Sequence, residues 1–290
     1  MRHLLAADRV RFGRRRDLWI LIALVPVILA VMFAADFNGV TTPPQFDFIM
    51  DPPDPVAEAE LRAQMLAEWR GQMLTQVPAF TFPASLLKVA GNFVPVILLS
   101  IYLATALVAG EFEWGTVRTV HLTSSRGRTL AVRVAAVGIM ICTVIGIGLL
   151  LATIIPFLLS VEGAPLQTYA GPVPEFWAGL ANRLAVLLPF ITIPVLMAVV
   201  ARSIGAAFLL TLLFFVADLA ITGAPIWATS PAPWVPAVTF SGSVSRLIGG
   251  DDSMQALVAP AAVSFGALLA WAVVPVAGAI AWFRRIDLNE

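Results

Sequence analysis

Charged residues are scarce in this chain of 290 residues. They make up 12% of the sequence, whereas a soluble domain has about a quarter. Hydrophobic residues make up 59%, and the mean hydropathy is +0.90. The charges are too few to cover a water-exposed surface, which excludes an ordinary soluble protein and predicts an integral membrane protein.

Lysine, cysteine and histidine are nearly absent. Lys88 is the single lysine, and because a valine follows it, the chain has no phosphate-binding loop ending in Lys-Ser or Lys-Thr. The single cysteine, Cys142, cannot form an internal disulfide, and His3 and His121 are too far apart for a zinc-binding HExxH helix. Basic and acidic residues are equal in number, so no net charge attracts nucleic acid. We therefore expect no catalytic residue, metal or cofactor in this chain, and no nucleic acid among its partners.

Six charge-poor apolar intervals are long enough to cross a bilayer, which takes about 20 helical residues. Backbone polar groups in hydrocarbon must be bonded internally, so each interval predicts an α-helix. The predicted spans are residues 18–35, 89–110, 134–161, 176–201 and 203–222, and a last one within 253–283 that starts near Pro260. The predicted fold class is all-α integral membrane, with six transmembrane helices in a single transmembrane domain, residues 1–290.

The distribution of arginine and lysine predicts the orientation of these spans. If the N-terminus is cytoplasmic, thirteen of the eighteen basic residues lie inside, while eleven of the eighteen acidic residues lie outside. We therefore expect both termini in the cytoplasm, with residues 1–17 as a cytoplasmic amphipathic segment. A cleaved signal peptide is the alternative for this N-terminus, but its apolar stretch is longer than usual and five more spans follow.

Two long segments are expected outside the membrane. In residues 36–88, Asp54 and Pro55 predict the start of a helix whose apolar residues recur every three to four positions. This helix lies on the outer membrane surface or packs on the bundle, or else it forms a substrate gate or a docking surface. Residues 223–259 are rich in proline and tryptophan, which favours re-entrant or interfacial half-helices over a plain loop.

Asp218 lies within the fifth predicted span. An ionisable residue is costly in hydrocarbon and is therefore a functional candidate, here for proton coupling or for a cationic substrate in a substrate pathway. Alternatively, its carboxylate lies at the membrane interface or is hydrogen-bonded between helices, because the position is only a few residues from the outer end of the span.

The inner segment between the second and third spans, residues 111–133, carries the most information. The run at residues 110–119 reads GEFEWGTVRT, and Ser125 and Arg126 follow it. The run combines two acidic residues at the membrane boundary with a glycine turn and a threonine that can cap a short helix. Such a helix-turn presents both signs of charge to a soluble partner. A well-capped loop is the alternative interpretation.

This run resembles a segment common in permeases of the ABC type-2 exporter family, roughly G-E-aromatic-x-x-G-T-x-R-T followed by a Ser-Arg turn. The layout is also similar, with a basic N-terminal segment, six spans, a large outside loop after the first span and an interrupted outside hairpin before the sixth. The resemblance implies a coupling segment that docks on a separate ATP-binding subunit, which holds the ATP and magnesium. The implied interface residues are Glu111, Glu113, Gly115, Thr116, Arg118 and Arg126.

The resemblance implies a transmembrane permease subunit of an ATP-binding cassette exporter in the bacterial cytoplasmic (inner) membrane. The chain would pair with a second permease subunit, as a homodimer or a heterodimer, and would not itself be an enzyme. Its apolar spans favour an amphipathic or lipid-like substrate, moved outward. Two alternatives stay open: an ion-coupled secondary transporter that uses Asp218, and a membrane anchor that recruits an ATPase.

Overall fold

The computed structural model describes residues 16–44, 55–89, 94–113, 126–158, 173–224, 232–249 and 260–285. Within these ranges six helical stretches are long and apolar enough to cross a membrane. They are α2 (Arg16–Thr41), α5 (Val94–Glu113), α7 (Arg126–Leu158), α8 with α9 (Val173–Leu187 and Pro189–Ala201), α10 (Ile204–Thr222) and α13 (Ala261–Arg285). The prediction of an all-α, multi-pass membrane architecture with six spans is confirmed.

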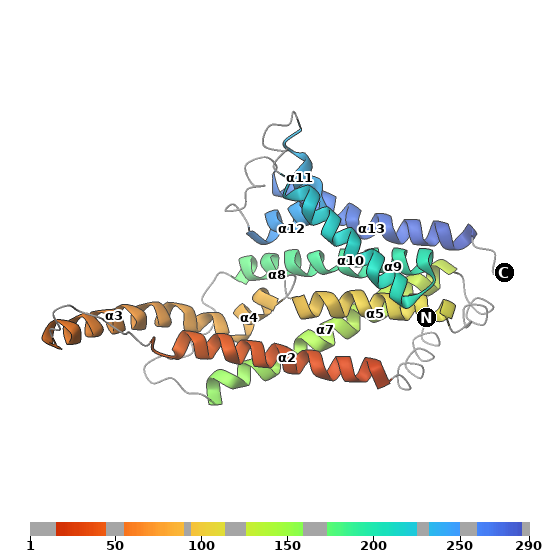
Figure 1. The fold of residues 1–290 in the computed structure, drawn as a ribbon. Helices are drawn as coiled ribbons and strands as arrows, with labels where there is room; N and C mark the ends of the chain where they lie inside the picture. Colours follow the sequence, from red (N-terminus) through yellow and green to blue (C-terminus); the bar gives the residue numbers. More distant parts are fainter. Residues whose placement is uncertain are drawn as a thin grey trace.

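Successive spans alternate in direction, so the start of α2 and the end of α13 lie at the same end of the bundle (Figure 1). The end of α5 and the start of α10 meet there as well, through a contact of Glu113. We call this the Glu113 end. The short helices α4 (Phe82–Val89), α11 (Val235–Val238) and α12 (Phe240–Gly249) lie toward the opposite end, which we call the Asp218 end.

α5 is the central helix of the bundle. In its span 72% of the residues are buried, against 17% in the span of α10. It packs on α2, α7, α9 and α10, and residues such as Leu29, Leu103, Val137 and Ile191 belong to one shared apolar core. Because lipid is as apolar as these side chains, close packing and polar contacts must decide which helices stay together.

Several span boundaries differ from the prediction. α2 continues to Thr41, past Asp36, and α5 continues past residue 110 so that its last turn includes Glu111 and Glu113. α7 begins at Arg126 rather than at 134, so the second part of the 111–133 segment is helical. The prediction ended the first span before Asp36 and the second before Glu111, but each helix continues past a carboxylate that has a basic partner nearby.

The fourth span is broken into α8 and α9 at Leu188. Pro189 follows as the first residue of α9, where its missing N–H costs no intrahelical bond. α9 ends at Ala201, and its C-cap residue Arg202 has a left-handed φ of 56° and an N–H that bonds to the Ala198 carbonyl at 3.0 Å. That conformation costs about 1 to 2 kcal/mol for a residue with a Cβ. The turn into α10 is therefore tight and must be held by its surroundings.

The insertion between the first two spans contains α3 (Pro55–Gln76), which begins at the predicted proline. α3 projects away from the spans at the Asp218 end (Figure 1) and packs Met73 against Val40 at its base. Lys88 Nζ lies 2.8 Å from Asp36 Oδ2, so an ion pair joins the two ends of the insertion. The insertion is thus anchored on the end of α2.

Gly148 on α7 allows α2 to approach closely. A Cβ added at Gly148 would lie 2.5 Å from Leu29 Cδ1, whereas a Cβ added at Gly146 would have nothing within 4 Å. Leu29 is fully buried and has little room to move.

We expect Gly148→Val to lower the free energy of unfolding by about 1 to 3 kcal/mol, the usual cost of overpacking. Gly146→Val, the matched control, should change it by no more than about 0.5 kcal/mol. Thermal unfolding of the purified protein in nanodiscs measures both, and the double variant Gly148→Val/Leu29→Ala should recover part of the loss. Equal effects of the two glycine substitutions would contradict this packing.

Candidate functional site

Glu111 and Arg133 form a buried ion pair at the Glu113 end of the bundle. The Glu111 carboxylate, in the last turn of α5, accepts a hydrogen bond from the Arg133 guanidinium of α7. Both residues are buried. Residues 114–125 connect these two helices, so the pair joins the helices that flank this segment.

Glu113, the last residue of α5, binds a different helix. Its Oε1 accepts a hydrogen bond of 2.7 Å from the backbone N–H of Ile204, the first residue of α10. Ser203 occupies the N-cap position of α10, but its side chain makes no capping bond. The start of a helix carries unpaired N–H groups and a partial positive charge. A carboxylate from α5 therefore supplies the cap that the local sequence of α10 does not.

Two of the six predicted interface residues have described side chains. Glu111 is buried against α7, so its contact lies within the bundle, while Glu113 keeps an exposed surface beside its bond to Ile204. Arg126 is placed as the first residue of α7. The other three lie outside the described residues: Gly115, Thr116 and Arg118. The two acidic residues thus anchor one end of the predicted coupling segment.

Asp218 caps a helix at the opposite end of the bundle. It is buried near the end of α10, where Oδ1 accepts from the Phe240 N–H (3.0 Å) and Oδ2 from the Ser241 N–H (2.7 Å). The Ser241 hydroxyl also donates to Oδ2. Both oxygens are therefore engaged by α12, in the interhelical hydrogen bonding that the sequence analysis kept as the alternative to a substrate or proton site.

Aromatic and hydroxyl contacts surround this cap. The Phe240 ring of α12 lies 5.2 Å from the Phe215 ring of α10 and 4.9 Å from the Phe190 ring of α9, measured between centroids. The hydroxyl oxygens of Thr222 on α10 and Thr239, which precedes α12, are 2.7 Å apart. Polar and apolar contacts together fix the start of α12 to α10.

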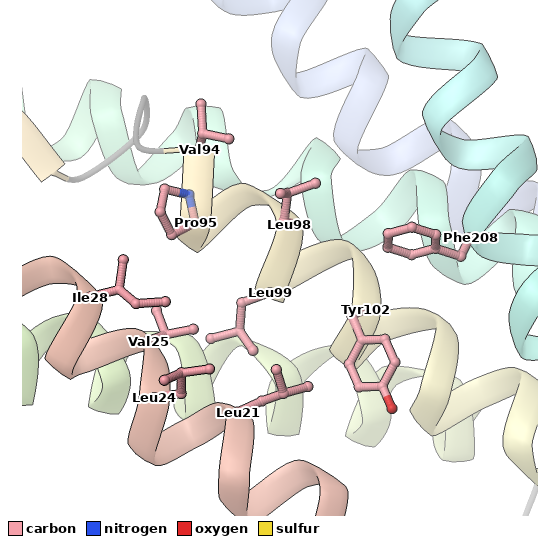
Figure 2. A pocket seen from close by; sticks show the side chains of 10 residues that line it. All are labelled: Leu21, Leu24, Val25, Ile28, Val94, Pro95, Leu98, Leu99, Tyr102 and Phe208. Carbon is pink, nitrogen blue, oxygen red and sulfur yellow. The ribbon is translucent and has the colours of Figure 1, made fainter.

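An apolar groove of about 540 Å³ lies between α2 and α10, across the face of α5 (Figure 2). Of the ten residues that line it, only Tyr102 has a polar side-chain group. The ten are Leu21, Leu24, Val25 and Ile28 on α2, Val94, Pro95, Leu98, Leu99 and Tyr102 on α5, and Phe208 on α10. Such a surface offers few partners to a sugar or an ion and fits an acyl chain or another apolar group.

The sequence analysis missed Arg133, the groove and the partners of both capping carboxylates. Arg133 stood at the predicted edge of the third span, opposite an acidic residue at the end of the second, and that juxtaposition is a signal that points to the pair. The other cap has no such signal, because Glu113 and the Ile204 N–H are 91 positions apart and one partner is a backbone group.

The described helices define the chain as a multi-pass helical membrane protein. Among the residues that the structure describes, no group of three or more His, Cys, Asp or Glu side chains could hold a metal ion. No protein-family model matches the chain, and no curated protein matches it. What the chain does must therefore be inferred from its own residues and contacts.

A buried and an exposed ion pair provide a matched test of the Glu111–Arg133 contact. We expect Arg133→Met to lower the free energy of unfolding by about 3 to 5 kcal/mol, because it leaves a buried carboxylate without its partner. The double variant Glu111→Leu/Arg133→Met should recover most of this loss, since no charge remains buried. Lys88→Met, at the half-exposed pair with Asp36, should cost about 1 kcal/mol or less. Equal losses for Arg133→Met and Lys88→Met in nanodisc unfolding would contradict this assignment.

Replacing Asp218 separates capping from ion binding. Asparagine keeps one of the two acceptor oxygens, so Asp218→Asn should lose less stability than Asp218→Ala. Asp218→Ala should cost about 1 to 3 kcal/mol, because the buried N–H groups of α12 lose their acceptor. Unfolding in nanodiscs measures stability, and transport into vesicles measures activity. A folded Asp218→Asn protein as inactive as Asp218→Ala would favour a proton or ion site instead.

Proposed function

We propose that the chain is the transmembrane permease subunit of an ATP-binding cassette exporter of the type-2 family, located in the bacterial cytoplasmic membrane. A separate ATP-binding subunit supplies the energy, and a second permease subunit completes the pathway. Under this proposal the Glu113 end and both termini are cytoplasmic, and α11 and α12 are the re-entrant hairpin at the outer face. The substrate is amphipathic or lipid-like.

The observation that carries the proposal is the set of bonds that joins the start of the predicted coupling segment to the bundle. The helix that leads into the segment, α5, is bonded to α7 through Glu111 and Arg133 and to α10 through Glu113. A displacement of this segment by an ATP-binding subunit therefore acts on three spans together. An exporter needs such bonds between the coupling segment and the spans if nucleotide binding in one subunit is to move helices in another.

The groove supports the choice of substrate. Its walls come from α2, α5 and α10, and its lining is apolar apart from Tyr102. α10 starts at the bond between Ile204 and Glu113, so a shift of the coupling segment also moves the helix that carries Phe208 into the groove. A change in the coupling segment thus changes the width of the surface that would hold an apolar chain.

A second permease subunit is part of the proposal because one groove on the side of one bundle does not enclose a pathway. α10, which supplies Phe208 to the groove, also exposes large apolar side chains, among them Leu209 and Leu213. A partner facing α2 and α10 would cover these side chains and close the groove.

The proposal predicts that an ATP-binding subunit copurifies with the tagged chain from its native membrane in mild detergent. Arg118→Glu and Arg126→Glu should each reduce its recovery about fivefold or more, because an energetically important interface residue contributes more than about 1 kcal/mol. Quantitative mass spectrometry of the purified complex measures the recovery.

Arg70→Glu on α3, at the opposite end of the bundle, is the matched control and should leave the recovery unchanged. Glu113→Arg is a poorer probe, because it also removes the cap on Ile204. Unchanged recovery in both interface variants, or no ATPase with the wild-type chain, would refute the proposed function.

A further inference from the structure

A carboxylate cap lies at each end of α10. At the start of the helix, the Ile204 N–H donates to Glu113 of α5. Near its end, its own Asp218 accepts from the first two N–H groups of α12, those of Phe240 and Ser241. The two caps lie about 21 Å apart along the axis, at 1.5 Å per helical residue. α10 is therefore bonded to a different helix at each end of the bundle.

The start of α12 depends on α10 beyond the Asp218 bonds. The third N–H group of α12, that of Gly242, donates to Thr239 Oγ1 at 3.2 Å. The hydroxyl of Thr239 in turn lies 2.7 Å from the hydroxyl of Thr222 on α10. A Cβ at Gly242 would overlap the Pro236 carbonyl oxygen, so the junction has no room for a side chain. The first two N–H groups of α12 thus bond directly to α10, and the third is linked to it through the Thr239 hydroxyl.

Between its ends, α10 is an uninterrupted helix that packs on α9 and α5 along one side and is exposed on the other. Each of the other five spans contains a proline, but α10 contains none, so no proline kinks it between the caps. Its buried residues are Ala207, Thr211 and Asp218, which fall on one narrow stripe. A helix that is bonded at both ends and packed on one side moves as a rigid body more readily than a helix packed on all sides.

From these contacts we infer that α10 is a strut, meaning a rigid helix that transmits a displacement from one end to the other. It links the coupling segment at the Glu113 end to α12 at the Asp218 end. A displacement of Glu113 moves the start of α10, the helix carries the movement along its axis (Figure 1), and Asp218 shifts the start of α12. The role of this movement, opening the outer hairpin during export, rests on the proposed function. The mechanical coupling itself is a property of this chain alone.

The coupling is tested on the purified full-length chain in nanodiscs by hydrogen–deuterium exchange, without an ATPase or a substrate. We expect Glu113→Ala, which removes the acceptor of the Ile204 N–H, to speed exchange of the amides of Phe240, Ser241 and Gly242 at least about fivefold, the lower end of usual allosteric couplings. Coupling between sites is reciprocal, so Asp218→Ala should likewise speed exchange of the Ile204 amide. Glu175→Ala, which removes an exposed carboxylate from the first turn of α8, is the matched control and should change neither.

A rescue variant distinguishes two causes of faster exchange at α12: the loss of transmission along α10 and a general loss of stability. Ser203→Asp gives α10 a local N-cap but no bond to α5. In Glu113→Ala/Ser203→Asp, exchange at Ile204 should return to the wild-type rate while exchange at the start of α12 stays fast. If Glu113→Ala does not fold, the shorter carboxylate of Glu113→Asp replaces it in the same comparison.

Two results would overturn the inference that α10 is a strut. One is unchanged exchange at the start of α12 in the Glu113 variant, and the other is a return of that exchange to the wild-type rate on adding Ser203→Asp. The result is independent of the copurification experiment. An uncoupled α10 would leave the ATPase partnership standing, and a missing ATPase would leave the measured coupling standing.

Discussion

The arrangement of the bundle depends on three carboxylates, each of which pairs with a group on another helix. A buried guanidinium, or a buried helix start such as that of α12, costs several kcal/mol unless an acceptor reaches it, and the start of α10 is capped in a more exposed place. Glu111 meets Arg133 on α7, Glu113 meets the start of α10, and Asp218 meets the start of α12. Apolar packing fills the space between helices with little preference among neighbours, so these bonds specify which helices are joined.

The same bonds separate the spans into a fixed centre and a movable edge. α5 is mostly buried and supplies two of the three carboxylates, so its position is determined along its whole length. α10 is mostly exposed, and its position is determined by the bonds at its ends and by packing of one side on α9 and α5. In water an exposed apolar helix would be driven into the core, but in lipid no such force acts. A span can therefore be both stable and loosely packed.

The six spans could be predicted because lipid forces the backbone into helices and because apolar length marks them. The boundaries of the spans could not be predicted, since Asp36 and Glu111 lie inside helices. Their basic partners, Lys88 and Arg133, come from elsewhere in the chain. Resemblance marked Glu111 and Glu113 as functional candidates, but the bond from the Ile204 backbone has no signature in residue type. The groove depends on how α2, α5 and α10 pack, which no local pattern determines.

The division between polar ends and apolar middle suits an exporter of the proposed kind. Moving α10 along the groove changes contacts between Phe208, its apolar neighbours and lipid, and no described hydrogen bond between helices has to break there. Moving either end of α10 strains a hydrogen bond to a carboxylate. The helix is thus easily displaced where a lipid-like substrate would bind and is held where neighbouring elements act on it. A polar network in the middle of the span would resist the displacement and bind apolar cargo poorly, so the lack of charge between the two caps is a requirement of this mechanism.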